Sequence, residues 1–382
     1  MEIDNLLKRQ KNVLPERRKK LYYIALIKFI ALIKLIKWHV IIWNKKPIDY
    51  GARMCEILFI SSGFLVGYNY YQTSMPSTYE SSIKYVYKHL RTFYPLEMIN
   101  TLYGFYLYKG NSFNLTDIEV LISNLLLIKS WSRFSQLASC FNGISWFLSA
   151  LIFCYSLVPF LLNAIKKVKT SLILFFFVSL LRISIEEFIN KGALNMFDVH
   201  FHRGPIIRLL EFFLGLLMTP TYFSLKSKIN KFEHCKWFKI IFTLIQIFLI
   251  IFSYYLMLNY NNIFYRCYFV IIFCVFIFVS GFDYGYLSDV ISHRICQNIM
   301  SCQMEMYLFQ NTINNIIDTI IKFLNLSVSL NEEIEFLFKL IIIFIIGYSY
   351  KKFVKEIFSK CFDFFIFIIN LFNYGIKEAI FD

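Results

Sequence analysis

Long apolar segments recur along the whole chain and are separated by short polar ones. A helix that crosses a membrane needs roughly 20 mostly apolar residues. By that measure the sequence predicts ten spans, at residues 21–43, 50–71, 91–108, 144–164, 170–185, 205–223, 236–258, 263–281, 303–322 and 335–350. A further apolar stretch at 118–128 is interpreted as a re-entrant or interfacial piece. The predicted fold class is therefore all-α, a polytopic integral membrane helical bundle.

The composition agrees with this class. Hydrophobic residues make up 58% of the 382 positions and charged residues only 17%, which is more apolar and less charged than a soluble domain. A net charge of +15 in a soluble protein would suggest nucleic acid. In this chain the lysines and arginines gather in short segments between apolar runs, where they orient helices and meet anionic lipid headgroups. Nucleic acid is therefore excluded as a partner, and the lipid bilayer is expected.

The distribution of positive charge predicts the topology. Basic residues gather in segments 1–20, 165–169 and 224–235 and in the tail, which all fall on one side of a ten-span arrangement. The positive-inside rule places that side, with both termini, in the cytoplasm of a multi-pass cell membrane protein, the inner membrane if the source is bacterial. The segment 109–143 on the other side carries Lys129 and Arg133 and fits this topology less well.

The chain is expected to form one membrane unit with two flanking pieces. Residues 1–20 are a basic cytoplasmic segment, residues 21–350 form the transmembrane domain, and residues 351–382 form a cytoplasmic or interfacial tail rich in lysines and aromatics.

Several familiar site chemistries are not indicated. The nine cysteines are scattered, with no C-x-x-C pair, so neither a disulfide framework nor a zinc site is expected. His200 and His202 lie close to Asp198 but lack a clear third ligand, and no metal site is predicted. The G-x-S-x-G, Gly-rich phosphate-loop and H-E-x-x-H signatures of hydrolases, P-loop proteins and zincins are missing from the sequence.

Ionisable residues inside apolar segments are costly and are therefore candidates for function. Lys28 and His39 lie eleven residues apart in the first predicted span, so they share one helix face and are about 16 Å apart along the axis. The alternative for His39 is an interfacial histidine in an aromatic belt with Trp38 and Trp43.

Two further pairs of charges follow. Arg53 and Glu56, and likewise Arg208 and Glu211, are spaced i, i+3, so each pair has either a functional part or an internal ion pair as its explanation. Gly63, after two serines, is predicted to let another helix approach closely.

A basic segment with aromatic neighbours precedes the third predicted span. Lys88 and Arg91 there are read either as phosphate contacts for a cytosolic donor or as positive-inside anchors.

Taken in order, six segments resemble acyltransferase family 3, the ten-helix O-acyltransferases of cell-surface glycans. They are Lys28 with His39, LFISSGF at 58–64, Lys88 and Arg91 before Tyr94-Pro95, WFLSALIFCY at 146–155, Arg208 with Glu211, Phe212 and Gly215, and MEMYLFQ at 304–310. The chain departs from the family pattern at three positions. Lysine stands for arginine at 28 and 88, and Gln310 stands where histidine is common.

The resemblance implies transfer of an acyl group, acetyl by default, from cytosolic acyl-CoA to a hydroxyl of a cell-surface or lipid-linked glycan. It implies no bound cofactor, because acyl-CoA is a donor substrate. His39 is expected to act as the general base or acyl relay, oriented by Glu56 or Glu211.

The remaining site residues are assigned to the two substrates. Lys28, Lys88 and Arg91 are expected to bind the CoA phosphates, and Trp146 and Arg208 to contact the substrate beside His39.

Two other functions stay open at this point. One is a multispan transporter or flippase for lipid-linked saccharides, which inverted repeats and Gly/Pro-broken helices would favour. The other is a glycan polymerase, which would need a larger outer loop than the sequence offers.

Overall fold

The computed structural model describes residues 20–42, 49–71, 75–108, 115–131, 141–190, 203–232, 235–258, 263–324, 331–364 and 366–367. Within these ranges every regular element is helical. The main helices are α2 (Tyr22–Lys37), α3 (Asp49–Tyr70), α4 (Tyr79–Tyr108), α5 (Leu115–Leu125), α7 (Trp146–Ala164), α8 (Val168–Asn190), α10 (Pro205–Leu217), α11 (Thr219–Ile229), α12 (Lys236–Leu258), α13 (Ile263–Ser280), α16 (Gln303–Phe323) and α17 (Glu332–Ser349). The shorter elements are η1 (Trp38–Ile42), η2 (Lys129–Trp131), η3 (Asn230–Phe232), α14 (Tyr286–Ile291), α15 (Arg294–Met300) and η4 (Tyr350–Val354).

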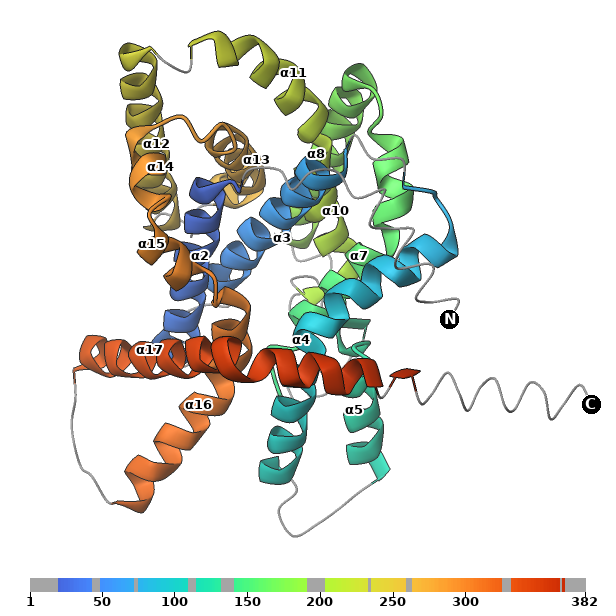
Figure 1. Cartoon of the computed structure of the whole chain (residues 1–382), viewed down its shortest axis with the longest axis vertical. Helices are drawn as coiled ribbons and strands as arrows, with labels where there is room; N and C mark the ends of the chain where they lie inside the picture. Colours follow the sequence, from blue (N-terminus) through green and yellow to red (C-terminus); the bar gives the residue numbers. More distant parts are fainter. Residues whose placement is uncertain are drawn as a thin grey trace, which may run out of the picture.

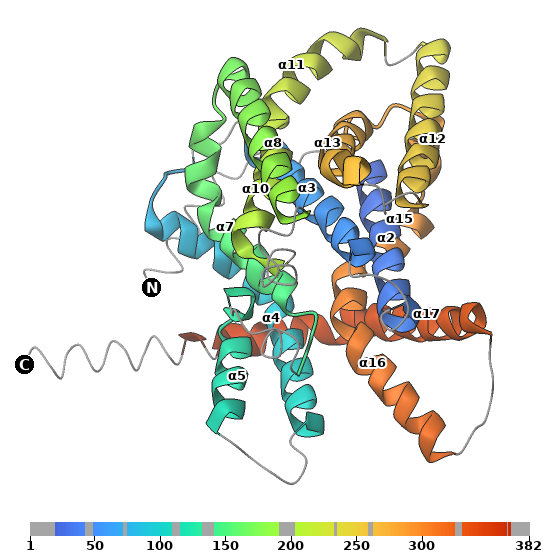
Figure 2. The same cartoon turned by 180° about the vertical axis from the view of Figure 1, so that it is seen from behind.

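Helix α3 is the central element of the bundle. It runs diagonally through the middle of the molecule in both views (Figures 1 and 2) and packs against α2 on one side and α10 on the other. Helices α7, α8 and α13 also contact it or its neighbour α10. Side chains of α3 therefore lie next to residues that are far away in the sequence.

Two glycines set the distance between α3 and α10. A Cβ atom at Gly63 would lie 1.8 Å from the carbonyl oxygen of Phe212, and one at Gly215 would lie 1.9 Å from that of Ile60. The two backbones are thus in direct contact, as small residues permit between membrane helices. The close approach predicted for Gly63 is confirmed.

Each of the ten predicted spans coincides with a helix, but not every helix is equally apolar. Among the described residues, four helices are long and apolar enough to cross a membrane, namely Trp146–Ala164, Val168–Phe188, Pro205–Phe232 and Lys236–Tyr255. They match the predicted spans at 144–164, 170–185, 205–223 and 236–258. The all-α membrane class follows from these four helices, while the count of ten and the side of each terminus stay predictions.

Burial explains Lys129, one of the two basic residues that disturbed the charge pattern; the other, Arg133, lies outside the described residues. Helix α5 has only 11 residues, about 16 Å of helix, which is too short to cross the apolar layer. Lys129 follows it in η2, is 1% exposed, and donates hydrogen bonds to Asn124 and to the backbone carbonyl of Asn142. Its charge is inside the protein and does not mark a side of the membrane.

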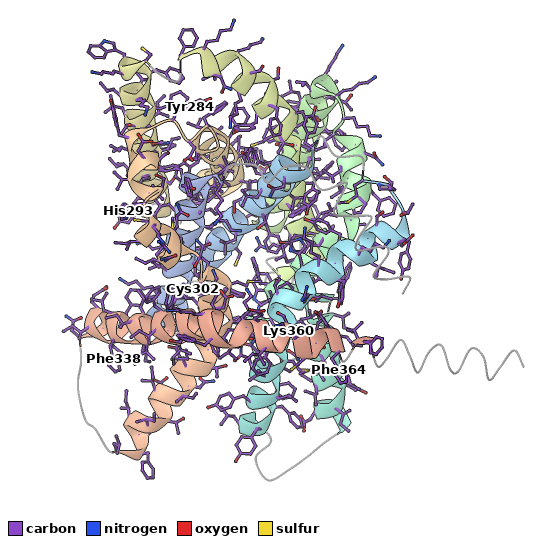
Figure 3. All side chains as sticks on the ribbon, in the orientation of Figure 1. Tyr284, His293, Cys302, Phe338, Lys360 and Phe364 are labelled. Atoms are coloured by element: carbon purple, nitrogen blue, oxygen red, sulfur yellow. The ribbon has the colours of Figure 1, made fainter. Side chains whose placement is uncertain are left out.

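The chain after α17 continues through η4 into a helix at 355–364. In Figure 1 this long red element crosses the lower part of the molecule, at a steep angle to α12. Figure 3 labels Lys360 and Phe364 near its end, where the helix passes α4. Asp363 forms an ion pair with Arg91 of α4 at 2.7 Å and accepts a hydrogen bond from Tyr87 at 2.8 Å. This part of the tail packs on the protein.

Replacing Gly63 by leucine should force α3 and α10 apart, because the new side chain meets backbone rather than a movable side chain. We expect a loss of stability of about 1–3 kcal/mol or more, measured as a lower midpoint of thermal unfolding in detergent. Asn69→Leu, at an exposed position of the same helix, is the control and should leave the midpoint unchanged. Equal midpoints for Gly63→Leu and Asn69→Leu would contradict the close approach.

Candidate active site

Six charged side chains form one buried network between three helices. They are Arg53 and Glu56 of α3, Arg182 and Glu186 of α8, and Arg208 and Glu211 of α10, each at most 3% exposed. Arg182 contacts all three glutamates, with Nη1 to Glu186 at 2.7 Å, Nη2 to Glu56 at 3.0 Å and Nη2 to Glu211 at 3.1 Å. Arg53 pairs with Glu56 and Glu186, and Arg208 pairs with Glu211 at 2.6 Å.

Among the described residues, the network contains three positive and three negative charges. Such balance is required, because an uncompensated charge in an apolar interior is expensive. Both i, i+3 pairs noted in the sequence form internal ion pairs, but each also reaches α8. The six side chains therefore connect α3, α8 and α10 through ion pairs between helices.

Arg208 links the network to Trp146. Its guanidinium lies 5.6 Å from the centre of a Trp146 ring and 5.7 Å from that of Phe59, which are cation–π distances. Trp146 is the first residue of α7. The structure thus brings together the two residues predicted to bind substrate, although they are 62 positions apart in the chain.

His39 lies in η1, the short π-helical turn that ends α2. Its Nδ1 is 3.1 Å from Oε1 of Gln310 on α16, and its ring packs edge-on against Trp38. Trp38 in turn covers Gly51, where a Cβ would lie 2.8 Å from the indole. A π-turn at this place is typical of a functional segment.

Arg203, two residues before α10, adds a positive charge beside His39. It interacts electrostatically with His39, and also with Cys55 of α3 and Tyr307 of α16. Tyr307 is also within electrostatic range of Arg208. These interactions connect Arg203 with the imidazole of His39, the thiol of Cys55 and the phenol of Tyr307.

Two of the basic residues predicted to bind the donor, Lys28 and Lys88, contact α3 farther along its length. Lys28 of α2 donates a hydrogen bond to Ser62 at 3.3 Å, and Lys88 of α4 donates one to Tyr70 at 2.9 Å. Along α3, Gly51 contacts Trp38, which is next to His39 in the chain. Ser62 then contacts Lys28, and Tyr70, farther along, contacts Lys88. At 1.5 Å per residue, Gly51 and Ser62 are about 16 Å apart along the helix axis, and Ser62 and Tyr70 are about 12 Å apart.

Arg91, the third predicted donor contact, already has a carboxylate partner. The ion pair with Asp363 leaves its side chain 47% exposed, at the edge of the bundle. Beside it, His89 is enclosed by the rings of Tyr85 and Tyr155, at 4.7 and 4.4 Å between centres.

A second buried polar cluster lies just before Trp146. Glu97 of α4 accepts hydrogen bonds from Asn142 at 2.8 Å and from Thr101 at 3.0 Å. Ser145 donates to Asn124 at 3.1 Å, and Lys129 donates to the same oxygen. These bonds fix the turn that begins α7, and with it the position of the indole.

The sequence interpretation missed three charged members of this site. Arg182 is an arginine inside an apolar run, a signal that by itself marks a functional candidate in a membrane helix. Glu186 falls one residue beyond the predicted span at 170–185, and Arg203 has no distinctive spacing. Asp198, His200, His202 and Trp43 lie outside the described residues.

The structure and its interior charges define a helical membrane protein with a polar, buried site. Comparison with known families then identifies it. The model of an acyltransferase domain, that of acyltransferase family 3, matches residues 21–351, nearly the entire chain. The chain belongs to this family and is a membrane acyltransferase. Neither a curated protein nor a solved structure matches it.

Removing the central arginine of the network should destabilise the fold. In Arg182→Leu three glutamates lose a partner, and breaking a buried ion pair typically costs 3–5 kcal/mol. We expect a large drop in the thermal midpoint in detergent, partly recovered in the double variant Arg182→Leu/Glu186→Leu.

The control is Lys84→Ala, which breaks an exposed ion pair with Glu80 on α4. Exposed pairs contribute at most about 1 kcal/mol, so this variant should unfold close to the wild-type temperature. If Arg182→Leu unfolds at that temperature too, the network does not hold the helices together.

Proposed function

We propose that this protein transfers an acyl group, acetyl in the first instance, from acyl-CoA to a hydroxyl of a cell-surface or lipid-linked glycan. The observation that supports this best is the order of polar groups along α3. Trp38, next to His39 in the chain, packs on Gly51 in the first turn of α3, while Lys28 contacts Ser62 and Lys88 contacts Tyr70 toward its end. From Gly51 to Tyr70 the helix rises about 28 Å, close to the roughly 30 Å thickness of a bilayer's apolar layer.

This order suits a donor and an acceptor that arrive from opposite sides. The phosphates of acyl-CoA carry several negative charges, and Lys88 and Lys28 supply positive ones where the donor would enter from the cytoplasm. The flexible arm of CoA then reaches along α3 and brings the thioester toward His39. The glycan hydroxyl approaches His39 from the other side.

The chemistry needs one base and one site for negative charge. His39 takes the proton from the acceptor hydroxyl while that oxygen attacks the thioester carbonyl carbon. The carbon–sulfur bond of the tetrahedral intermediate then breaks, and the leaving thiolate takes the proton from the imidazolium to give free CoA. Arg203 or Arg208 offers a cation for the developing oxyanion.

The remaining site residues have supporting parts in this proposal. Trp146 and Arg208 bind the acceptor, since a flat indole stacks on a sugar ring and a guanidinium donates to its hydroxyls. Glu56 and Glu211 are the acidic side of the same site. Both carboxylates are paired with arginines. We therefore propose that Glu56 and Glu211 hold Arg208 in position and, through Arg208, also Trp146.

His39→Ala should abolish acyl transfer. The test is a proton NMR count of O-acyl groups on the surface glycan of a deletion strain, complemented with wild type or variant at equal membrane levels. His293→Ala is the matched control, because His293 is exposed and caps α15. We expect acyl groups to return with wild type and His293→Ala but not with His39→Ala.

Two outcomes would redirect the assignment. Full acylation with His39→Ala would remove the base role. Full acylation in the deletion strain itself, together with less glycan at the surface, would favour the transporter over the acyltransferase acting on this glycan.

Lys88→Ala should weaken binding of acyl-CoA. Hydrogen bonds to charged groups contribute about 1.5–3 kcal/mol, which corresponds to a rise in KM for acyl-CoA of about tenfold or more. Lys84, one turn earlier on the same helix, is the control, and Lys84→Ala should leave KM unchanged. Equal KM values for the two variants, measured with purified protein in nanodiscs, would exclude Lys88 from the donor site.

A further inference from the structure

Gln310 is the hydrogen-bond partner of the candidate base, and it stands where the family commonly has histidine. It lies on α16, is 0% exposed, and its carboxamide oxygen is 3.1 Å from His39 Nδ1. Its position decides which nitrogen of His39 carries the proton.

The reason is the chemistry of the two groups. A neutral imidazole has one N–H donor and one acceptor nitrogen, and a carboxamide oxygen can only accept. The contact between Oε1 and Nδ1 therefore requires the proton on Nδ1. In that tautomer Nε2 carries the lone pair, which can accept the proton of the acceptor hydroxyl.

The backbone around Gln310 is held in place on several sides. Tyr307, one turn earlier, donates a hydrogen bond to the carbonyl of Ile144 at 2.8 Å. Asn100 of α4 donates to the carbonyl of Leu308 at 3.0 Å and accepts from Thr312 at 2.9 Å. Gln310 is thus presented to His39 from a fixed turn of α16.

The other half of the amide supports a role beyond packing. Within the described part of the chain, Nε2 of Gln310 is buried and has no hydrogen-bond partner. An unpaired buried donor lowers stability. An amide that lacks a partner at one end gives up stability there, and among the described residues the paired end of this one faces the imidazole.

We propose that Gln310 is a positioning residue that holds His39 in the Nδ1–H tautomer and so makes Nε2 the catalytic base. The inference rests on the proposed function for its consequence in catalysis, but the tautomer itself is measurable without turnover.

The first experiment is ¹⁵N NMR of full-length protein with labelled histidine in nanodiscs. The His39 signals are assigned by difference from His39→Asn, and protonated and unprotonated ring nitrogens are told apart by their shifts. We expect a protonated Nδ1 and an unprotonated Nε2 in wild type, and loss of this preference in Gln310→Leu. A protonated Nε2 in wild type would overturn the proposal, since it means that the amide donates instead.

The second experiment is the pH dependence of acyl transfer. Gln310→Leu should lower kcat roughly 100-fold, within the range that general base catalysis contributes, with KM for acyl-CoA unchanged. Gln310→Glu keeps an acceptor of the same shape but stabilises the protonated imidazole. Its rate should therefore rise only at higher pH than wild type.

Asn315→Leu is the matched control, an exposed amide on the same helix that should retain wild-type rate, pH profile and NMR signals. If Gln310→Leu does not fold, Gln310→Glu decides through the pH profile, and an unshifted profile overturns the proposal. A wild-type kcat in Gln310→Leu also overturns it. Failure of the proposed function looks different, because the wild-type protein would then show no acyl transfer, whichever tautomer the NMR spectrum reports.

Discussion

A balanced set of buried charges governs the arrangement of this membrane protein. Three arginines and three glutamates from α3, α8 and α10 pair with one another, and Arg182 contacts each of these glutamates. None of these helices can shift without exposing a charge to an apolar interior, which is far more costly than losing a packing contact. The network therefore fixes the geometry on which Trp146 and Arg208 depend.

The close packing of α3 and α10 serves the same geometry. Gly63 and Gly215 let the two backbones touch, which brings the arginine–glutamate pairs of both helices within ion-pair distance. One end of α3 contacts Trp38, the residue before His39. Farther along, Ser62 and Tyr70 of α3 contact Lys28 and Lys88. A single helix thus orders the polar groups by depth, which is the order that transfer between two sides of a membrane requires.

The interior polar groups are also connected by helices that are less apolar than a typical span. Helix α16 has many polar residues, and the structure gives several of them a partner. Gln310 meets His39, Thr312 meets Asn100, and Asp318 meets Lys339 at 2.7 Å. Through Gln310 this helix contacts the candidate base.

The sequence by itself determined the class, the position of the helices and the family. An unbroken apolar run of about 20 residues satisfies its own backbone hydrogen bonds in lipid by forming a helix, and motifs such as WFLSALIFCY can be recognised in the sequence without knowledge of contacts. It also indicated Lys28, His39, Arg208 and Glu211, because charges inside apolar runs stand out.

Only the tertiary structure decided the partners of these residues. Glu56 and Glu211, expected to orient His39, are held by arginines, while Gln310 contacts the imidazole. The structure also showed that Arg182, Arg203 and Asp363 interact with residues that are distant in sequence. The physical reason is that an ion pair depends on a few ångströms between side chains, and that distance is set by how helices pack and not by how residues are spaced along one of them.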